Sequence, residues 1–381
     1  MASIVEVAFR TPVLTARGGA TVTQPHWSTA IAGAVNDGPG STHPATYLIR
    51  NRGVTTVNVK VRITASQGVR DATGTVTGVL GGIQITGTCP TNVGDHDVAA
   101  NIQQLPDSVN RVQGDMPWTF QTNSSGPVNL GSTRVELYFV LDSPGAIYQA
   151  TGVWVEVLRF CCDNANALGV QQKKVLAARV TTFCHDGHGL TYDTTAGRPY
   201  YGTDGLGAGT FQLTDYLTNA RGVTVNCYDQ ASAIQVLAAA FGVHMSRLYM
   251  SPFGFINTTT LVSAITCNNP FFSSNGSAPV CAVDDPLRTG FGNHAFCQFL
   301  DSQNADVSPP SSSGGPPTPT PVPTSPALVA DACAGPHTAT ETKQQYVTAS
   351  VDSVNRPAAA GTVANMQPAP GNPEIGVTSI A

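Results

Sequence analysis

Charged residues are scarce in this sequence of 381 residues: Asp, Glu, Lys and Arg together make up 11%, against about 25% in an average globular protein. No Lys/Arg cluster occurs and the formal net charge is −5, so we expect no nucleic-acid partner. No run approaches the roughly 18 apolar residues of a transmembrane helix, so we expect no membrane span. The first residues lack the basic end and apolar run of a signal peptide, which predicts a cytoplasmic protein or one exported by a leaderless route.

Metal-site and cofactor signatures are also missing. No Cys-X-X-Cys pair occurs among the nine cysteines, which argues against zinc-ribbon and thioredoxin-type sites. Ligand-type side chains do occur in residues 184–188, but they are crowded into five positions without a distant partner pair, so we interpret this segment as a Gly-rich loop. The Gly-rich residues 205–209 have no preceding strand and no Lys-Ser or Lys-Thr after them, unlike a phosphate-binding loop. We therefore predict no metal and no cofactor, and either nine free thiols or eight paired and one free.

Glycine and proline are abundant, with 38 and 27 residues, and hydrophobic residues make up 41% of the chain. This composition is typical of a turn-rich β protein with a sizeable core and excludes global disorder. Apolar and polar side chains alternate along residues 57–64, 135–141 and 153–158, which is the period of half-buried strands. Several short strands without an intervening helical pattern favour a sandwich. We predict an Ig-like, all-β sandwich over residues 1–165, with a structural or binding role.

One later segment has a clear helical pattern, and it begins at a cysteine. An apolar stripe at spacings of three and four is formed by Ala231, Ile234, Leu237 or Ala238, and Phe241. The segment is rich in alanine, the strongest helix former, and Gly242 follows it where a left-handed C-terminal cap is expected. Cys227 therefore lies in the first turn of the predicted helix, where the positive end of the helix dipole favours a thiolate.

Two predicted strands carry side chains that could act together with this cysteine. His294 opens the candidate strand 294–300, and Asp331 lies at the end of the candidate strand 328–332. A nucleophilic cysteine needs an imidazole within hydrogen-bond reach, and the imidazole needs a third group that fixes its orientation. Asp301, at the end of the histidine's strand, is the alternative for that third group. We predict a triad of Cys227, His294 and Asp331.

Two segments of low complexity complete the organisation. Residues 308–326 are dominated by proline, serine, threonine and glycine, and proline excludes them from a helix or a central strand. We expect an extended, solvated loop there, within a second domain of residues 166–355. Residues 356–381, rich in Ala, Pro, Gly and Asn, are predicted to form a flexible tail.

The residues around the triad carry a resemblance to a known family. Residues 226–243 resemble the cysteine helix of the transglutaminase-like (papain-fold) superfamily of cysteine acyltransferases and proteases. His294-Ala295-Phe296 is similar to the family's His-Ala-Trp strand, residues 329–332 are similar to its strand bearing the aspartate, and the order Cys, His, Asp agrees. The spacing from His294 to Asp331 is longer than usual, and removing the Pro-rich segment restores it.

The resemblance covers residues 220–350 and implies an α+β papain/transglutaminase-like catalytic domain. It implies a cysteine-dependent amide hydrolase or acyl transferase acting on protein or peptide amides, that is, a protease or deamidase. Cys227 would be the nucleophile, His294 the base and Asp331 the orienting carboxylate, with the backbone amide of Cys227 as the first oxyanion donor. Tyr228 stands where true transglutaminases commonly have Trp, which favours hydrolysis over cross-linking. The alternatives are a non-catalytic binding or adhesion protein and an exported toxin-type deamidase.

Overall fold

The computed structural model describes residues 1–11, 13–29, 43–49, 55–65, 71–202, 209–305, 326–368 and 376–381. The chain divides into two compact units. The first contains Met1–Ser143 and Tyr148–Leu158, and the second contains Pro144–Ile147 and Arg159–Ala381. No helix in the described ranges is long and apolar enough to cross a membrane. Residues 308–325 of the predicted Pro-rich loop and the Gly-rich residues 205–208 lie outside the described residues.

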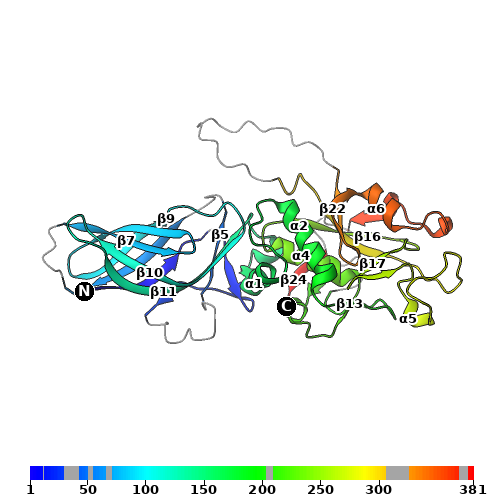
Figure 1. The fold of residues 1–381 in the computed structure, drawn as a ribbon, viewed down its shortest axis with the longest axis horizontal. Coiled ribbons are helices and arrows are strands. Elements are labelled where there is room, and N and C mark those ends of the chain that lie inside the picture. The colour runs from blue at the N-terminus through cyan, green and yellow to red at the C-terminus, as the bar shows by residue number, and fades with distance from the viewer. Residues whose placement is uncertain are drawn as a thin grey trace. The chain divides into compact units, whose positions relative to one another are not determined.

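The first unit is built on one large sheet (Figure 1). As far as the chain is described, its nine strands run in the order β4-β1-β6-β9-β8-β7-β10-β11-β5. In chain order they are β1 (Ala2–Phe9), β4 (Trp27–Ser28), β5 (Ala45–Leu48), β6 (Thr56–Ile63), β7 (Thr73–Leu80), β8 (Ile83–Pro90), β9 (Gly94–Ile102), β10 (Asn110–Gln121) and β11 (Val128–Val140). A smaller sheet of β12 (Val153–Trp154), β2 (Thr15–Arg17) and β3 (Ala20–Thr21) belongs to the same unit.

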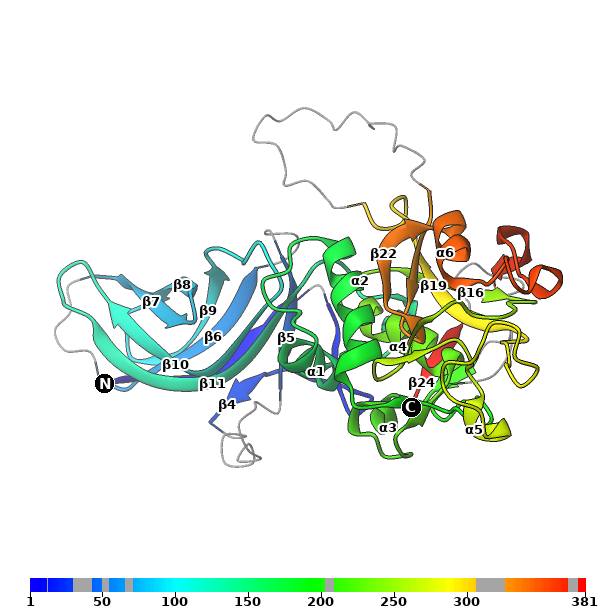
Figure 2. The ribbon, with the colours of Figure 1, turned by 45° about the vertical axis from the view of Figure 1, so that its right-hand side comes forward.

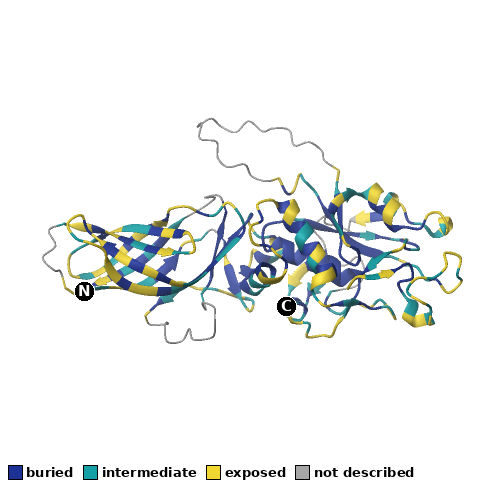
Figure 3. Ribbon diagram, in the orientation of Figure 1, coloured by how far each residue is buried: buried dark blue, intermediate teal, exposed yellow. Residues whose placement is uncertain are grey.

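The alternation along β6 was predicted correctly, but the predicted Ig-like sandwich is not confirmed. Val57, Val59, Val61 and Ile63 of β6 are buried as the alternation predicts, and Figure 3 shows buried and exposed positions alternating along the long strands. The strands form a single curled sheet, in which β1 contacts β11 across the core, and not the two sheets of an Ig-like sandwich. Alternation identifies the buried face of each strand but not which strands pair with it. Side chains repeat every two residues both in a single curled sheet and in a two-sheet sandwich.

The predicted strand at residues 153–158 is wrong after its first two residues. Strand β12 ends at Trp154, and helix α1 (Val155–Asn164) begins at the next residue. Val155, Leu158 and Cys161, at spacings of three, are all fully buried. The same apolar run therefore satisfies a helical period, and a run this short does not distinguish the two periods. Cys161 and Cys162 are free thiols in this helix.

The second unit has a five-stranded antiparallel sheet in the order β22-β20-β19-β16-β23, as far as the chain is described. Its strands are β16 (Met245–Met250), β19 (His294–Phe299), β20 (Leu328–Asp331), β22 (His337–Thr342) and β23 (Met366–Pro368). Helices α2 (Lys173–Thr182) and α4 (Cys227–Ala239) contact each other and pack on this sheet, α2 against β20 and β22 and α4 against β16 and β19 (Figure 2). Every residue of α4 is buried, so this helix is the centre of the unit.

Shorter elements surround this core. The described strands are β13 (Thr191–Tyr192), β14 (Gly209–Phe211), β15 (Thr224–Val225), β17 (Thr259–Leu261), β18 (Ile265–Cys267), β21 (Ala334–Gly335) and β24 (Val377–Ile380). The described helices are η1 (Ala146–Tyr148), the π-helix η2 (Phe183–Gly187), α3 (Leu213–Thr218), α5 (Phe272–Asn275), α6 (Lys343–Ser350), η3 (Pro357–Ala359) and η4 (Val363–Asn365). Ile256 and Val351 form an isolated β-bridge.

Two segments of the predicted flexible tail, residues 366–368 and 377–380, form strands. Strand β23 pairs with β16, and β24 pairs in parallel with β14. The amide of Val377 also donates to Gln235 Oε1 of α4 at 2.9 Å. Strand β23 extends the edge of the five-stranded sheet, and β24 forms a two-stranded sheet with β14. Both pairings are tertiary effects that local composition does not reveal. The second unit therefore continues beyond residue 355 to Ala381.

Candidate active site

Cys227 is the first residue of α4, and the sequence before it fixes that start. Asn226 is the N-cap: its side-chain oxygen accepts from the amides of Tyr228 at 2.9 Å and Asp229 at 3.2 Å. In return, Asp229 Oδ2 accepts from the amide of Asn226 at 3.1 Å. This reciprocal capping box satisfies amides that a helix N-terminus otherwise leaves unpaired. It holds Cys227, which is 4% exposed, at a fixed position at the positive end of the helix.

Asp229 also anchors the preceding loop to the helix. Its carboxylate accepts from the amides of Tyr200, Tyr201 and Gly202, at 2.6–3.1 Å. Burial raises the pKa of Asp229, and these backbone hydrogen bonds oppose that effect. One buried carboxylate therefore ties two segments together beside Cys227.

Strand register brings His294 and Asp331 together. Strands β19 and β20 pair with Cys297 opposite Ala330, so one further step of this register places Asp331 opposite Phe296, two residues from His294. Residues two apart on a strand share a face, and diagonal neighbours across a pair are within reach of long side chains. His294 Nε2 lies 2.8 Å from Asp331 Oδ2, and both side chains are buried.

Asp331 is held by three further donors. Its Oδ1 accepts from the amides of Cys333 at 2.8 Å and Ala334 at 3.2 Å, and its Oδ2 accepts from the Tyr346 hydroxyl at 2.9 Å. Hydrogen bonds to the ionised form stabilise a buried carboxylate. Burial acts to raise the pKa of Asp331, but the charge and hydrogen bond of His294, and after them the charge of His337 and the Cys333 amide, hold the pKa far below its usual range.

The surroundings of His294 favour the protonated form of its imidazole. Burial acts to lower the pKa of His294, but the Asp331 carboxylate, and after it the Cys227 side chain, outweigh burial and raise the pKa to about 10. Because Nε2 is bonded to Asp331, the buried Nδ1, which has no hydrogen-bond partner among the described residues, is the nitrogen left for the thiol. The geometry therefore leaves one imidazole nitrogen free to exchange a proton with a nucleophilic cysteine.

Aromatic rings enclose the imidazole. The ring centroids of Phe253, Phe291 and Phe296 lie 4.9, 5.0 and 5.8 Å from that of His294. Phe296 in turn contacts Tyr346 at 4.8 Å. These rings exclude water from the ion pair, which strengthens its electrostatic interaction, and they prevent the imidazole from turning away from the carboxylate.

Two contacts fix the first turn of α4 against β19. The Tyr228 hydroxyl donates to Asn293 Oδ1 at 2.6 Å, next to His294. The Cys297 thiol donates to the carbonyl oxygen of Ala231 at 3.2 Å. The buried Arg247 of β16 adds a cation–π contact, 5.1 Å from the centre of the Tyr228 ring. The helix start and the strand start thus keep a constant separation, which is what a cysteine–histidine pair requires.

The structure places the predicted residues as follows. His294 and Asp331 are in direct contact, and Cys227 is close enough to His294 to raise its pKa. Asp301, the alternative carboxylate, follows the far end of β19, about 20 Å from His294 at the usual rise per strand residue. The catalytic role of Cys227, His294 and Asp331 stays a prediction.

Sequence reasoning missed several residues of the site. Tyr346 reaches Asp331 from α6, and no local pattern indicates that contact. Tyr192 lies near Cys227 and Cys333: burial, and after it the charges of these two thiols, raise its pKa well above the usual value. Asn226 and Asp229 could have been found, because an N-cap residue followed three positions later by a carboxylate is a capping-box signature.

The cluster at residues 184–188 is not arranged as a metal site. Residues 184–187 lie in the π-helix η2 and not in the expected Gly-rich loop, and His185 Nδ1 donates to the carbonyl oxygen of Ala332 at 3.1 Å. His188 Nε2 donates to the carbonyl oxygen of Tyr216 at 2.6 Å. In the ranges that the structure describes, no group of three or more His, Cys, Asp or Glu side chains could hold a metal ion.

Comparison with known proteins gives distant structural likeness only. No protein-family model matches the sequence, and no curated protein matches it. Among solved structures, the chain is similar to the crystal structure of red sea bream transglutaminase, with a TM-score of 0.38 and 9% sequence identity over 79% of this chain and 52% of that one. The chain thus spans about half the length of that structure. A likeness this distant assigns no activity.

Proposed function

We propose that this protein is a transglutaminase-like cysteine enzyme, an amide hydrolase or acyl transferase that acts on protein or peptide amides. The observation that carries the proposal is the buried His294–Asp331 contact of 2.8 Å, with Cys227 beside the imidazole at a helix start. The second unit would hold the catalytic domain. The first unit would have a structural or binding role.

The reaction would proceed in two halves. The Cys227 thiolate attacks the carbonyl carbon of the amide, and the His294 imidazolium gives its proton to the departing amine, which leaves an acyl-enzyme. Water or an amine then attacks the acyl carbon, His294 accepts its proton, and the carbon–sulfur bond breaks to restore the thiolate. Asp331 keeps the ring in one orientation and stabilises its positive charge throughout.

The oxyanion formed in each half needs donors near the sulfur. The Cys227 backbone amide is the first, because the first amides of a helix have no intrahelical acceptor. We assign the second to the Tyr192 hydroxyl, on the strand β13 that pairs with β15 just before Cys227. Its electrostatic coupling to Cys227 supports this assignment.

Access to the sulfur would require local motion. Cys227 is only 4% exposed, so a substrate would reach it after neighbouring side chains move aside. Such opening steps are common in enzymes that exclude water from the reaction. The same enclosure would favour a flexible peptide or a Gln or Asn side chain, which are narrow enough to enter.

The test is mass-spectrometric profiling of a cell lysate after incubation with wild-type protein, with Cys227→Ala or with Cys89→Ala. Cys89 is a buried thiol in the first unit and serves as the matched control. A mass gain of one unit at Gln or Asn identifies a deamidase, new chain ends identify a protease, and linked peptides identify a transferase. We expect one of these changes with wild type and Cys89→Ala and none with Cys227→Ala. Identical profiles from wild type and Cys227→Ala would refute the proposal.

A further inference from the structure

Cys267 and Cys281 lie away from the triad residues, and both of their sulfur atoms contact Asn269. The Asn269 amide donates to Cys267 Sγ at 3.0 Å, and its side-chain Nδ2 donates to Cys281 Sγ at 3.3 Å. The two thiols point to adjacent carbonyl oxygens, Cys267 to Pro279 at 2.8 Å and Cys281 to Ala278 at 3.3 Å. Both sulfurs therefore contact one residue and one short stretch of chain.

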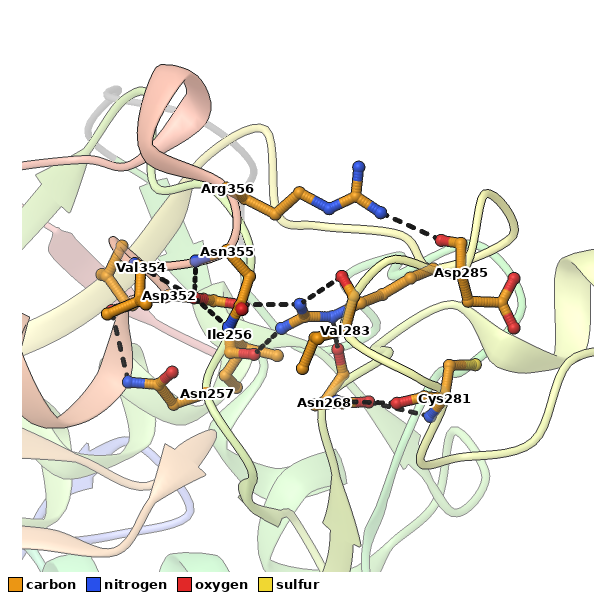
Figure 4. A network of polar contacts seen from close by, with 12 residues as sticks. Ile256, Asn257, Asn268, Cys281, Val283, Asp285, Asp352, Val354, Asn355 and Arg356 are labelled. Carbon is orange, nitrogen blue, oxygen red and sulfur yellow. Dashed lines mark hydrogen bonds and ion pairs between the residues drawn. The ribbon is translucent and has the colours of Figure 1, made fainter.

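The backbones of the two segments are clamped together. The side chain of Asn268, the residue after Cys267, accepts from the Cys281 amide at 3.0 Å and donates to the Cys281 carbonyl oxygen at 3.1 Å (Figure 4). The Asn268 amide donates to the Pro279 carbonyl oxygen at 3.3 Å. A disulfide requires Cα atoms about 4.4–6.8 Å apart. These hydrogen bonds hold the segments that carry Cys267 and Cys281 side by side before any disulfide forms.

A buried ion pair keeps this loop in place. Arg288 donates to Asp352 Oδ2 at 2.6 Å, and both side chains are at most 2% exposed. The same guanidinium donates to the carbonyl oxygens of Asn268 at 3.1 Å and Val283 at 3.3 Å. It thereby joins the segments that carry the two cysteines, and Figure 4 shows Asn268, Val283 and Asp352 converging on this network.

We propose that Cys267 and Cys281 are a disulfide-forming pair that closes on exposure to a small disulfide oxidant such as glutathione disulfide. Cys281 is partly exposed, whereas Cys267 is buried and burial raises its pKa to about 11. Oxidation therefore enters at Cys281. The proposal is independent of any role of Cys227.

The exchange has two steps. The Cys281 thiolate attacks one sulfur of glutathione disulfide, the sulfur–sulfur bond breaks, and one glutathione thiolate leaves and takes up a proton. The Cys267 thiol then loses its proton to solvent. The resulting thiolate attacks the Cys281 sulfur and displaces the second glutathione as a thiolate, which takes up a proton. Two protein thiols become one disulfide, and one glutathione disulfide becomes two glutathione thiols.

The bond would brace one side of the candidate active site. The closed loop contains Phe271, whose ring lies 6.2 Å from Tyr192 and 5.9 Å from Phe291. Phe291 is itself 5.0 Å from His294. A disulfide removes conformational freedom from the loop that it closes. A cross-link between residues 267 and 281 therefore restricts the motion of Phe271 against Tyr192 and Phe291.

The experiment uses the folded full-length protein, incubated with glutathione disulfide, then denatured, alkylated with iodoacetamide and digested with trypsin. Cleavage after Arg247 and Arg288 gives one peptide that contains Cys267 and Cys281 and no other cysteine. We expect that peptide to be two hydrogen atoms lighter than the dithiol and to carry no alkyl group, and to gain two alkyl groups after reduction. Further cleavage after Phe271 must leave the two fragments linked.

Two variants complete the test. Cys267→Ser should keep glutathione on Cys281, because the second attack is lost, whereas Cys89→Ser should form the disulfide as wild type does. Two alkyl groups on the wild-type peptide, or a glutathione adduct that persists on wild-type Cys281, would overturn the proposal. Because the wild-type result is read directly by mass, a variant that fails to fold does not affect it.

Discussion

His294 and Asp331 are 37 residues apart in the sequence and 2.8 Å apart in the structure. The contact follows from the antiparallel register of β19 and β20, which places the two side chains diagonally on one face. A charged pair that is almost fully buried is stable only when its remaining hydrogen-bonding atoms are satisfied. Asp331 meets this condition, since it accepts four hydrogen bonds.

Removing the charge of Asp331 tests its role in orienting the ring. Asp331→Asn keeps the size of the side chain but no longer stabilises an imidazolium. We expect turnover to fall by about 10⁴-fold, the loss typical of a triad carboxylate, measured as kcat on a substrate found by the lysate profiling. A loss of less than about tenfold would contradict an orienting role, because one misplaced catalytic contact alone costs more.

Tyr346→Phe is the matched change that leaves the charge in place. It removes one hydrogen bond to Asp331 Oδ2, and a hydrogen bond to a charged group contributes about 1.5–3 kcal/mol. We expect the free energy of unfolding to fall by that amount, with a much smaller effect on kcat than Asp331→Asn. The tryptophans all lie in the first unit, so hydrogen exchange of the β19 and β20 amides is the suitable measurement.

The pH dependence of stability should report the charged histidine. The pKa of His294 is raised from 6.5 to about 10 in the folded protein, so its contribution is fully present below about pH 6.5 and is lost as pH rises toward 10. Protection of the β19 amides should therefore decline over this interval in wild type. The decline should be smaller in His294→Asn and unchanged in His96→Asn, a control in the first unit. A wild-type profile that is flat over this interval would disprove the charged pair.

Tyr192→Phe separates stabilisation of the oxyanion from activation of the thiol. Loss of one oxyanion donor lowers kcat by roughly 10²–10³-fold, and we expect that loss here. Alkylation of Cys227 by iodoacetamide forms no oxyanion, so its rate should be unchanged. Tyr201→Phe, which removes a hydroxyl bonded to the Gly222 carbonyl oxygen, is the control. Equal effects of Tyr192→Phe on both rates would assign Tyr192 a packing role.

Breaking the Arg288–Asp352 pair should destabilise the second unit strongly. Removing one partner of a buried ion pair costs about 3–5 kcal/mol, because the other charge stays buried without compensation. We expect Arg288→Met to show this loss in chemical denaturation of the second unit. Arg221→Met is the control, because the Arg221–Asp215 pair is largely exposed and should contribute less than about 1 kcal/mol. Equal losses in the two variants would contradict the anchoring role of Arg288.

The sequence patterns correctly predicted structural features that depend on residues close together in the sequence. The period-two pattern gave the buried face of β6, and the apolar stripe gave the helix that starts at Cys227. The sheet order of the first unit and the strands β23 and β24 depend on contacts between distant segments, which composition does not encode. The strand expected at residues 153–158 became helix α1 because a short apolar run fits either period.

The candidate site divides in the same way. Cys227, His294 and Asp331 stand at the ends of predicted elements, so their residue types and positions pointed to them. Tyr346 and Tyr192 act through tertiary proximity, on elements with no chemical signature of their own. The contacts of Asn269 with the thiols of Cys267 and Cys281 likewise form only in the folded loop, so the sequence does not reveal them.

The rate at which iodoacetamide alkylates each of the nine cysteines, measured at mildly acidic pH, tests the central claim most directly. If the thiolate–imidazolium pair exists, Cys227 reacts fastest despite its 4% exposure, ahead of the partly exposed Cys281, and it loses that advantage in His294→Asn. If Cys227 instead reacts no faster than the other eight thiols, or equally fast in His294→Asn, the catalytic account is wrong and a non-catalytic binding protein is the better description.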